Sequence, residues 1–306
     1  MISKQASFRT LMDDIKISIR FAVKNLITFL LGMVGVLIVT GLLMGLVFGL
    51  IMLLLSVLIG FDAIVTFFMS LGVLLADSNA LAALPLVGLF VLPMLSPLFI
   101  ALGALYGIGR EIVESAGATA EGAFVWYRSK FLSLAGGGII IALFILGPLL
   151  VGFWLVLLLA GPVLSVSSQA ILTAVTVAWI LLAPGLVSMV FPAIIDGHSV
   201  VSAVKTSLRM SRDHFDRVLS TWLSFVLMAL VILAPTTVSQ TILLSGFVDA
   251  LPWTALLGGA AAIFTFTVLL PSLIIAQTRV YMILSGEDVP LESQETLPDM
   301  RLVGGV

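Results

Sequence analysis

Five stretches of the chain, each of at least 29 residues, contain no Asp, Glu, Lys or Arg. They are residues 25–61, 78–109, 131–195, 218–248 and 250–278. The hydrocarbon core of a bilayer is about 30 Å thick and is crossed by about 20 apolar residues of α-helix, so each stretch allows at least one crossing. Charged residues make up only 10% of the chain, whereas a soluble domain contains about 25%. The sequence therefore predicts an all-α membrane protein and excludes a soluble globular enzyme.

We predict six transmembrane helices, arranged as three tandem hairpins. Their approximate ranges are 27–58, 82–109, 131–160, 169–195, 218–245 and 254–283. The basic residues lie within residues 4–24, 110–130 and 205–217 and at positions 279 and 301. The connections at residues 62–80, 161–169 and 246–252 contain none of them. Because basic residues are retained on the cytoplasmic side of a membrane, both termini are expected in the cytoplasm.

The apolar segment of residues 63–76 is not counted among the six helices. It has 14 residues, which is too short for a comfortable crossing. If it did cross, Lys24 and Arg110 would lie on opposite sides of the membrane, against the distribution of the other basic residues. We therefore predict that residues 62–76 form a re-entrant or interfacial insertion on the outer side.

Each of the three predicted hairpins is preceded by an amphipathic, basic segment. In the first, apolar residues between Phe8 and Leu26 recur at helical spacing beside a stripe of Lys16, Arg20 and Lys24. The other two segments begin at residues 117 and 197 and share the pattern G-x-[ST]-[AV]-x-x-A. The predicted repeats are residues 8–110 with the insertion 62–76, residues 117–196 and residues 197–285, followed by a cytoplasmic tail of residues 286–306.

Every even-numbered predicted helix contains the pattern P-x-L. Its prolines are Pro93, Pro184 and Pro271. From the last basic residue before each hairpin to the proline there are 54 residues in the second and third repeats and 69 in the first. The difference of 15 equals the length of the insertion at residues 62–76. Because proline lacks the amide hydrogen of a helical hydrogen bond, we expect helix breaks at these three positions.

Glycines on the first two predicted helices are spaced for close helix contacts. Gly41, Gly45 and Gly49 lie on one face of the first helix, and Gly103 and Gly107 lie on one face of the second. Small residues at this spacing let helix backbones approach closely. Packing within the bundle is the simpler interpretation, and a contact in a homo-oligomer is the alternative.

The stretch from Pro192 through Asp196 and Ser207 to Val218 resembles a pattern in prokaryotic integral-membrane domains. In these domains a proline and an acid-glycine pair precede an Ala-x-x-x-Ser amphipathic helix, a basic residue and the next transmembrane helix. The domains are the membrane domain attached to some glycerophosphodiester phosphodiesterases and its uncharacterised stand-alone relatives. The resemblance implies a prokaryotic membrane protein. It does not imply hydrolase activity, because the catalytic barrel of the phosphodiesterases is absent from this chain.

Nine basic residues next to the predicted helices are expected at the plane of the lipid headgroups. They are Lys16, Arg20, Lys24, Arg128, Lys130, Lys205, Arg209, Arg212 and Arg217. Near an anionic leaflet each contributes about 1 kcal/mol to membrane binding. Topological anchoring is the simpler interpretation of these residues. Contact with anionic lipid, or with a cytoplasmic or membrane protein partner, is the alternative.

Arg279 is the basic residue predicted to lie deepest in the membrane, about one turn inside the sixth helix. Its side chain either extends to the headgroups or pairs with Asp196 or Glu111 at a neighbouring helix end. Asp196 is the expected partner, because it and Arg279 both lie at the cytoplasmic ends of even-numbered helices.

Neither a catalytic constellation nor a metal or cofactor site is predicted. The chain contains no cysteine, and His198 and His214 stand without a cluster of other ligands. Its net charge of −2 gives no long-range attraction to nucleic acid. We therefore predict a non-enzymatic multipass protein of a prokaryotic cytoplasmic membrane, with a role in lipid interaction, membrane homeostasis or support of a partner. A permease for a small neutral or amphipathic solute is the first alternative, and an intramembrane enzyme of lipid metabolism is the second.

Overall fold

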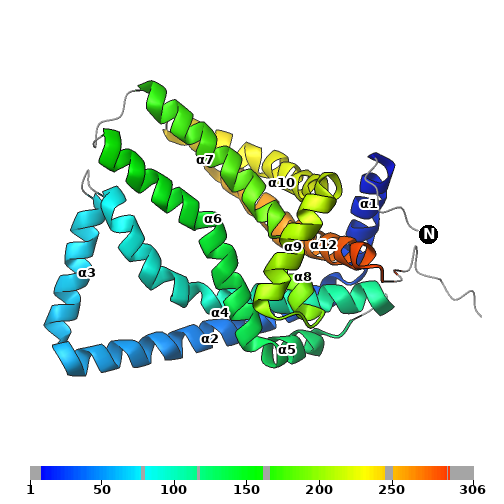
Figure 1. Cartoon of the computed structure of the whole chain (residues 1–306), viewed down its shortest axis with the longest axis horizontal. Helices are drawn as coiled ribbons and strands as arrows, with labels where there is room; N and C mark the ends of the chain where they lie inside the picture. The colour runs from blue at the N-terminus through cyan, green and yellow to red at the C-terminus, as the bar shows by residue number, and fades with distance from the viewer. Residues whose placement is uncertain are drawn as a thin grey trace, which may run out of the picture. The chain divides into compact units, whose positions relative to one another are not determined.

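A computed structural model describes residues 8–76, 80–115, 118–160, 166–244, 251–287 and 289 of this 306-residue chain. The described chain is 93% helical and contains no strand. Figure 1 shows its helices. In chain order they are α1 (Phe8–Lys24), α2 (Leu26–Ile59), α3 (Phe61–Ala76), α4 (Ala80–Ser115), α5 (Ala120–Ser129), α6 (Phe131–Ala160), α7 (Val166–Leu186), α8 (Val190–Ile195), α9 (Val200–Asp213), α10 (Phe215–Leu244), α11 (Leu251–Phe264), the π-helical turn η2 (Thr265–Leu269) and α12 (Leu270–Ser285).

Six helical stretches among the described residues are long and apolar enough to cross a membrane. They are Leu26–Ile59, Ser96–Ser115, Phe131–Val156, Ser167–Ile195, Phe215–Ala234 and Leu256–Ser285. Each overlaps one of the six predicted helices, so the prediction of an all-α membrane protein with six such helices is confirmed. Large apolar side chains such as Leu42, Leu155 and Val231 are exposed on them. Apolar surface of this extent is typical of a membrane or protein interface.

The predicted insertion is a separate helix, α3. It begins one residue after Gly60, whose φ of 88° lies in the left-handed region. The amide of Gly60 still donates to the carbonyl of Ser56 at 3.1 Å, so Gly60 closes the last turn of α2. Glycine adopts this conformation without the steric cost that a Cβ imposes, which explains why α2 ends here. The re-entrant or interfacial position of α3 stays a prediction.

The chain divides into two compact units. The first unit takes its residues from Met1–Gly32, Leu105–Ala123 and Arg209–Val306, and the second from Met33–Ala104 and Phe124–Leu208. Helices α2 and α4 each contribute to both units, so this division does not follow the three predicted repeats. The repeats stay a prediction, and the predicted tail lies largely outside the described residues, which end with 286, 287 and 289.

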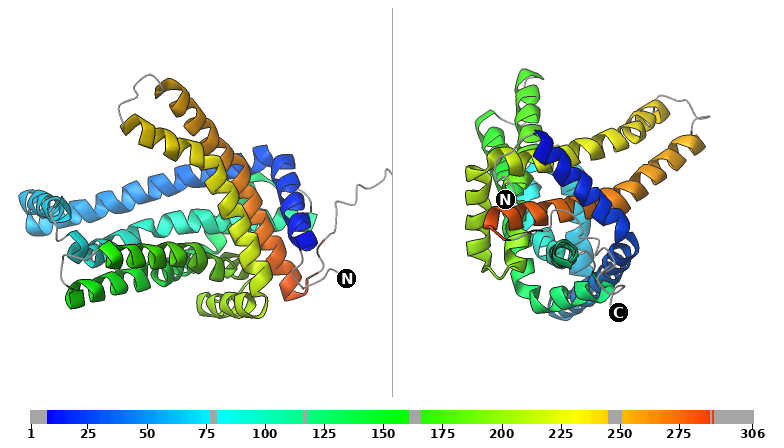
Figure 2. Two further views of the ribbon diagram at one scale, coloured as in Figure 1. Left: turned by 90° about the horizontal axis from the view of Figure 1, so that it is seen from above. Right: turned by 90° about the vertical axis from the view of Figure 1, so that its right-hand side faces the viewer.

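In the first unit, α1 packs against α10 and α12. Figure 2 shows α10 and α12 side by side in yellow and orange-red, with α1 in blue lying across them. A small apolar core joins Phe225 of α10, Leu269 of η2 and Ala276 of α12, and Ile15 of α1 packs against it. These contacts place the N-terminal helix against the C-terminal one.

In the second unit, glycines allow close helix contacts at some positions and not at others. A Cβ added at Gly103 would lie 3.1 Å from Cδ1 of Phe191 and would also meet Leu134. In contrast, a Cβ added at Gly41, Gly45 or Gly49 would have none of the described atoms within 4 Å. Close packing therefore accounts for Gly103. The described residues provide no packing partner for the glycine face of α2.

An indole hydrogen bond joins α6 and α7 in the same unit. Nε1 of Trp179 donates to the carbonyl oxygen of Ile145 at 2.8 Å, and the Trp179 ring packs on that of Phe144 with centroids 5.9 Å apart. Pro148 follows Ile145 by three residues and lies inside α6. Pro148 removes the amide that would bond the carbonyl of Phe144, and its ring clashes with that carbonyl. Next to this irregularity, the indole N–H of α7 gives the carbonyl of Ile145 a hydrogen-bond partner.

Replacing Trp179 with Phe is expected to lower the free energy of unfolding by about 1 kcal/mol, because one half-buried hydrogen bond is lost while most of the ring packing remains. Denaturation in mixed detergent micelles measures this change. Trp154 of α6 is 49% exposed and is the matched control. The same substitution at Trp154 should change stability by less than about 0.5 kcal/mol. Equal losses for the two variants would contradict a role for the indole N–H.

The three predicted helix breaks have different outcomes. α4 continues through Pro93, so no break occurs there. Pro184 lies two residues before the end of α7, and α8 begins only at Val190. Pro271 is the second residue of α12 and follows the π-helical turn η2. A π turn accommodates the missing amide hydrogen by shifting the hydrogen-bond register, and the chain is therefore irregular at two of the three positions.

Candidate functional site

Three ionisable side chains from three helices meet inside the first unit. Oδ2 of Asp14 on α1 accepts a hydrogen bond from Nη2 of Arg217 on α10 at 2.8 Å. Oδ1 of the same carboxylate lies 3.6 Å from Nη1 of Arg279 on α12. The three side chains are only 3–4% exposed. We call these three residues the arginine cluster.

The cluster forms because Asp14 lies on the face of α1 that packs against α10 and α12. Its buried residues are Asp14, Ser18, Phe21 and Ala22. Spacings of three and four residues place them on one face of a helix. The hydroxyl of Ser18 donates to the carbonyl oxygen of Asp14 at 2.6 Å. Asp14 is therefore the one carboxylate that α1 carries on the face packed against the other helices, since the neighbouring Asp13 is exposed.

The contacts of Arg279 offset only part of the free-energy cost of burying its charge. Its pairing distance of 3.6 Å to Asp14 is too long for a hydrogen bond. Its Nε and Nη1 atoms have no hydrogen-bond partner among the described residues. A buried charge is costly unless it is both paired and hydrogen-bonded. Arg279 therefore retains donors and positive charge that the described chain does not satisfy.

These positions differ from two of the predicted roles. Arg279 was expected to pair with Asp196 or to reach the headgroups, but its side chain is buried and its partner is Asp14. The carboxylate of Asp196 lies 3.9 Å from Nε2 of His198 instead. Arg217 was expected at the headgroups, but it is buried next to Asp14. Both corrections have the same cause, because α1 packs against α10 and α12 and covers the two arginines.

Sequence reasoning missed Asp14, although a signal for it was present. Asp14 falls among the apolar residues that recur at helical spacing along α1, next to Ile15 and four residues before Ser18. A charge within an otherwise buried helix face is expected to have a buried partner.

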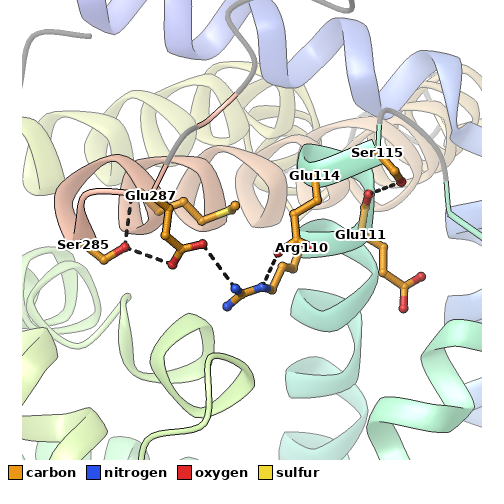
Figure 3. A network of polar contacts seen from close by, with 7 residues as sticks. Arg110, Glu111, Glu114, Ser115, Ser285 and Glu287 are labelled. Carbon is orange, nitrogen blue, oxygen red and sulfur yellow. Dashed lines mark hydrogen bonds and ion pairs between the residues drawn. The ribbon is translucent and has the colours of Figure 1, made fainter. Parts of the chain in front are cut away.

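A second ionic network joins the ends of α4 and α12 (Figure 3). Nε of Arg110 lies 2.7 Å from Oε1 of Glu114, and its Nη2 lies 3.2 Å from Oε2 of Glu287. The hydroxyl of Ser285 donates to the other oxygen of Glu287 at 3.1 Å. In Figure 3 the Glu111 carboxylate points away from Arg110. Arg110 thus lies between two carboxylates, unlike Arg279.

A polar contact within the transmembrane part of the first unit also went unpredicted. The phenol of Tyr106 on α4 donates a hydrogen bond to Oε1 of Gln277 on α12, and both side chains are buried. Next to it, a Cβ added at Gly109 would lie 3.1 Å from Cγ2 of Ile274. Close backbone approach and a buried hydrogen bond together hold α4 against α12.

Of the nine predicted headgroup contacts, seven are exposed. They are Lys16, Arg20, Lys24, Arg128, Lys205, Arg209 and Arg212. Lys130 is half-buried and Arg217 is buried. Each of the short helices α1, α5 and α9 carries at least one of the seven and directly precedes one of the long helices α2, α6 and α10.

The exposed surface of α1 has two stripes. Apolar side chains form one of them, with Phe8 80%, Met12 49% and Val23 55% exposed. Lys16, Arg20 and Lys24, each four residues apart, form the other. With about 3.6 residues per turn, the two stripes lie next to each other, and the buried residues around Asp14 occupy the remaining face. Helix α1 therefore has an apolar, a basic and a protein-facing side.

The chemistry available at these places is anion binding and helix attachment. Guanidinium groups offer several hydrogen-bond donors and a permanent positive charge. Within the described residues, no group of three or more His, Asp or Glu side chains could hold a metal ion. In comparisons with known proteins, no family model, curated protein or solved structure matches this chain. The resemblance to the phosphodiesterase membrane domains therefore stays a prediction.

Proposed function

We propose that this protein binds anionic lipid headgroups at the cytoplasmic face of a prokaryotic membrane, as a non-enzymatic multipass protein. The observation that carries the proposal is the pair of neighbouring apolar and basic stripes on α1. An amphipathic helix with this surface lies in the membrane interface, with its apolar stripe among the acyl chains and its basic residues among the headgroups.

The magnitude of the expected attraction supports this function. The three basic residues of the stripe on α1 contribute about 1 kcal/mol each near an anionic leaflet. Exposed apolar side chains as large as Phe8 and Met12 add a hydrophobic contribution of about 1.5–3 kcal/mol each when they are fully buried. Both contributions favour a negatively charged bilayer surface over bulk water.

The other two short helices carry the same combination of side chains. On α5, Phe124 and Val125 are exposed together with Arg128. On α9, Val201 is exposed, and Lys205, Arg209 and Arg212 follow it at spacings of four, four and three residues. Such spacings place residues on one helix face. Recurrence before α2, α6 and α10 supports a shared role for the three helices at one membrane surface.

Lipid selection in nanodiscs tests the proposal. We expect the full-length protein to enrich phosphatidylglycerol over phosphatidylcholine, as measured by native mass spectrometry of retained lipids. Substituting Lys16, Arg20 and Lys24 together with Gln should reduce the enrichment by about a hundredfold, because three favourable contributions of about 1 kcal/mol each are removed and about 1.4 kcal/mol corresponds to a factor of ten.

The matched control for this experiment keeps the charge of α1. The variant K16R/K24R retains the three positive charges of the stripe and should enrich phosphatidylglycerol as the unchanged protein does. If the Gln variant and the control enrich the anionic lipid equally, α1 is not the headgroup-binding element and the proposal fails.

A further inference from the structure

The two ionic groups of the first unit have opposite charge balances. Arg110 has two carboxylates within ion-pair distance, those of Glu114 and Glu287. Among the described residues, Arg279 has one carboxylate within ion-pair distance, that of Asp14. This carboxylate also accepts a hydrogen bond from Arg217 at 2.8 Å. We infer that the arginine cluster is a binding site for one phosphate group, which completes the coordination of Arg279.

Two atoms of Arg279 identify where such a group binds. Nε and Nη1 carry hydrogen-bond donors, and neither has a hydrogen-bond partner in the described part of the chain. The residue is only 2% exposed. Native proteins pair nearly all buried donors, and an unpaired one calls for an unseen partner. Since the unpaired donors belong to a cation, the partner that fits is an anion.

Neighbouring acids do not fill this position. Asp14 contributes one oxygen to Arg217, and its other oxygen lies 3.6 Å from Arg279. The side chain of Asp13 is exposed, so water screens its attraction. A phosphate group offers several acceptor oxygens around one centre, and it can therefore bond to Arg279 while Asp14 remains bonded to Arg217.

The position of the cluster along its helices suits a phosphate from a lipid headgroup or from solution. Arg217 is the third residue of α10, and Arg279 lies six residues before the end of α12. Six residues of helix correspond to about 9 Å. The cluster thus lies near the adjoining ends of these two helices, where a bilayer changes from hydrocarbon to headgroups. Helix α1 covers the site, so a phosphate group can reach it only if α1 moves.

Thermal unfolding of the full-length protein in phosphatidylcholine nanodiscs tests the inference, since a ligand that binds the folded state raises the melting temperature. One series adds inorganic phosphate at constant ionic strength with chloride as the reference anion. A second series replaces part of the lipid with phosphatidic acid in phosphate-free buffer. Stabilisation by the first, the second or both supports a phosphate site and identifies whether solution or lipid supplies the group.

Three substitutions make the test specific to the cluster. Arg279→Gln should raise the half-saturating phosphate concentration by about tenfold or more, because it removes a charged donor. Asp14→Asn removes a competing negative charge and should lower that concentration. Arg110→Gln is the matched control, since Arg110 already lies between two carboxylates, and it should leave the response unchanged.

The inference is overturned if neither phosphate nor phosphatidic acid stabilises the unchanged protein, or if Arg279→Gln responds as the unchanged protein does. Should Arg279→Gln not fold, the Asp14→Asn variant decides, and a phosphate response no stronger than that of the unchanged protein would count against the site. The variant with Gln at positions 16, 20 and 24 separates this inference from the proposed function. It must keep the response to inorganic phosphate even where its lipid enrichment is lost.

Discussion

Replacement of Asp14 with Ala is expected to lower the free energy of unfolding by about 3–5 kcal/mol, because it removes the carboxylate shared by two buried guanidinium groups. Arg217 and Arg279 are both only 3% exposed, so water cannot readily replace the lost partner. Unfolding in mixed detergent micelles measures the change. An effect of this size is large compared with the about 1 kcal/mol typical of a single substitution.

The adjacent residue provides the control. Asp13 has the same side chain on the same helix but is exposed, so Asp13→Ala should change stability by less than about 0.5 kcal/mol. The triple variant D14L/R217M/R279M provides a second test of the same cluster. It removes all three charges and should recover most of the stability, because apolar groups of similar volume replace a buried ionic cluster at little cost. Equal effects of Asp13→Ala and Asp14→Ala would contradict the burial of Asp14.

The second large effect is expected at Gly138 of α6. A Cβ added there would overlap the Cβ and ring of Phe99 on α4. The overlap involves an atom attached directly to the backbone, so a change of side-chain rotamer cannot relieve it. Gly138→Ala should therefore force α4 and α6 apart and lower the free energy of unfolding by about 1–3 kcal/mol, the range found for overpacked cores. The same denaturation experiment in mixed micelles measures it.

Gly41 of α2 is the matched position for this substitution. It also lies inside a membrane helix, but a Cβ there would meet none of the described atoms within 4 Å. Gly41→Ala should leave stability unchanged or raise it by up to about 1 kcal/mol, since alanine is the better helix former. A loss at Gly41 as large as that at Gly138 would contradict the assignment of the cost at Gly138 to overlap with Phe99.

Local sequence was sufficient to predict most of the helices. The six membrane helices were predictable because the absence of charge over about 20 residues is itself the physical requirement for crossing a bilayer. The end of α2 depends on Gly60, whose left-handed conformation is also a local property. Proline did not predict helix breaks reliably, since α4 continues through Pro93. Prolines are tolerated in membrane helices when their surroundings satisfy the freed backbone groups, and those surroundings are not local.

The arginine cluster could not be derived in the same way. Asp14 and Arg279 are 265 residues apart in the chain, and only the packing of α1 on α12 brings them to 3.6 Å. The charge pattern alone predicts that Arg217 lies at the headgroups together with Lys205, Arg209 and Arg212. Its burial depends on which residue of α10 faces α1, which the positions of the charges along the chain do not specify.

The amino-acid order determined where helices can cross a membrane and which segments carry basic charge, because both depend on residues close together in the chain. Tertiary structure alone decided which charges are buried and which glycines meet another helix. Gly103 is packed against Phe191 while Gly41 meets none of the described atoms, although both belong to the same kind of glycine pattern. The difference is physical, since burial and pairing are properties of the surface that a second helix covers, and that helix comes from a distant part of the chain.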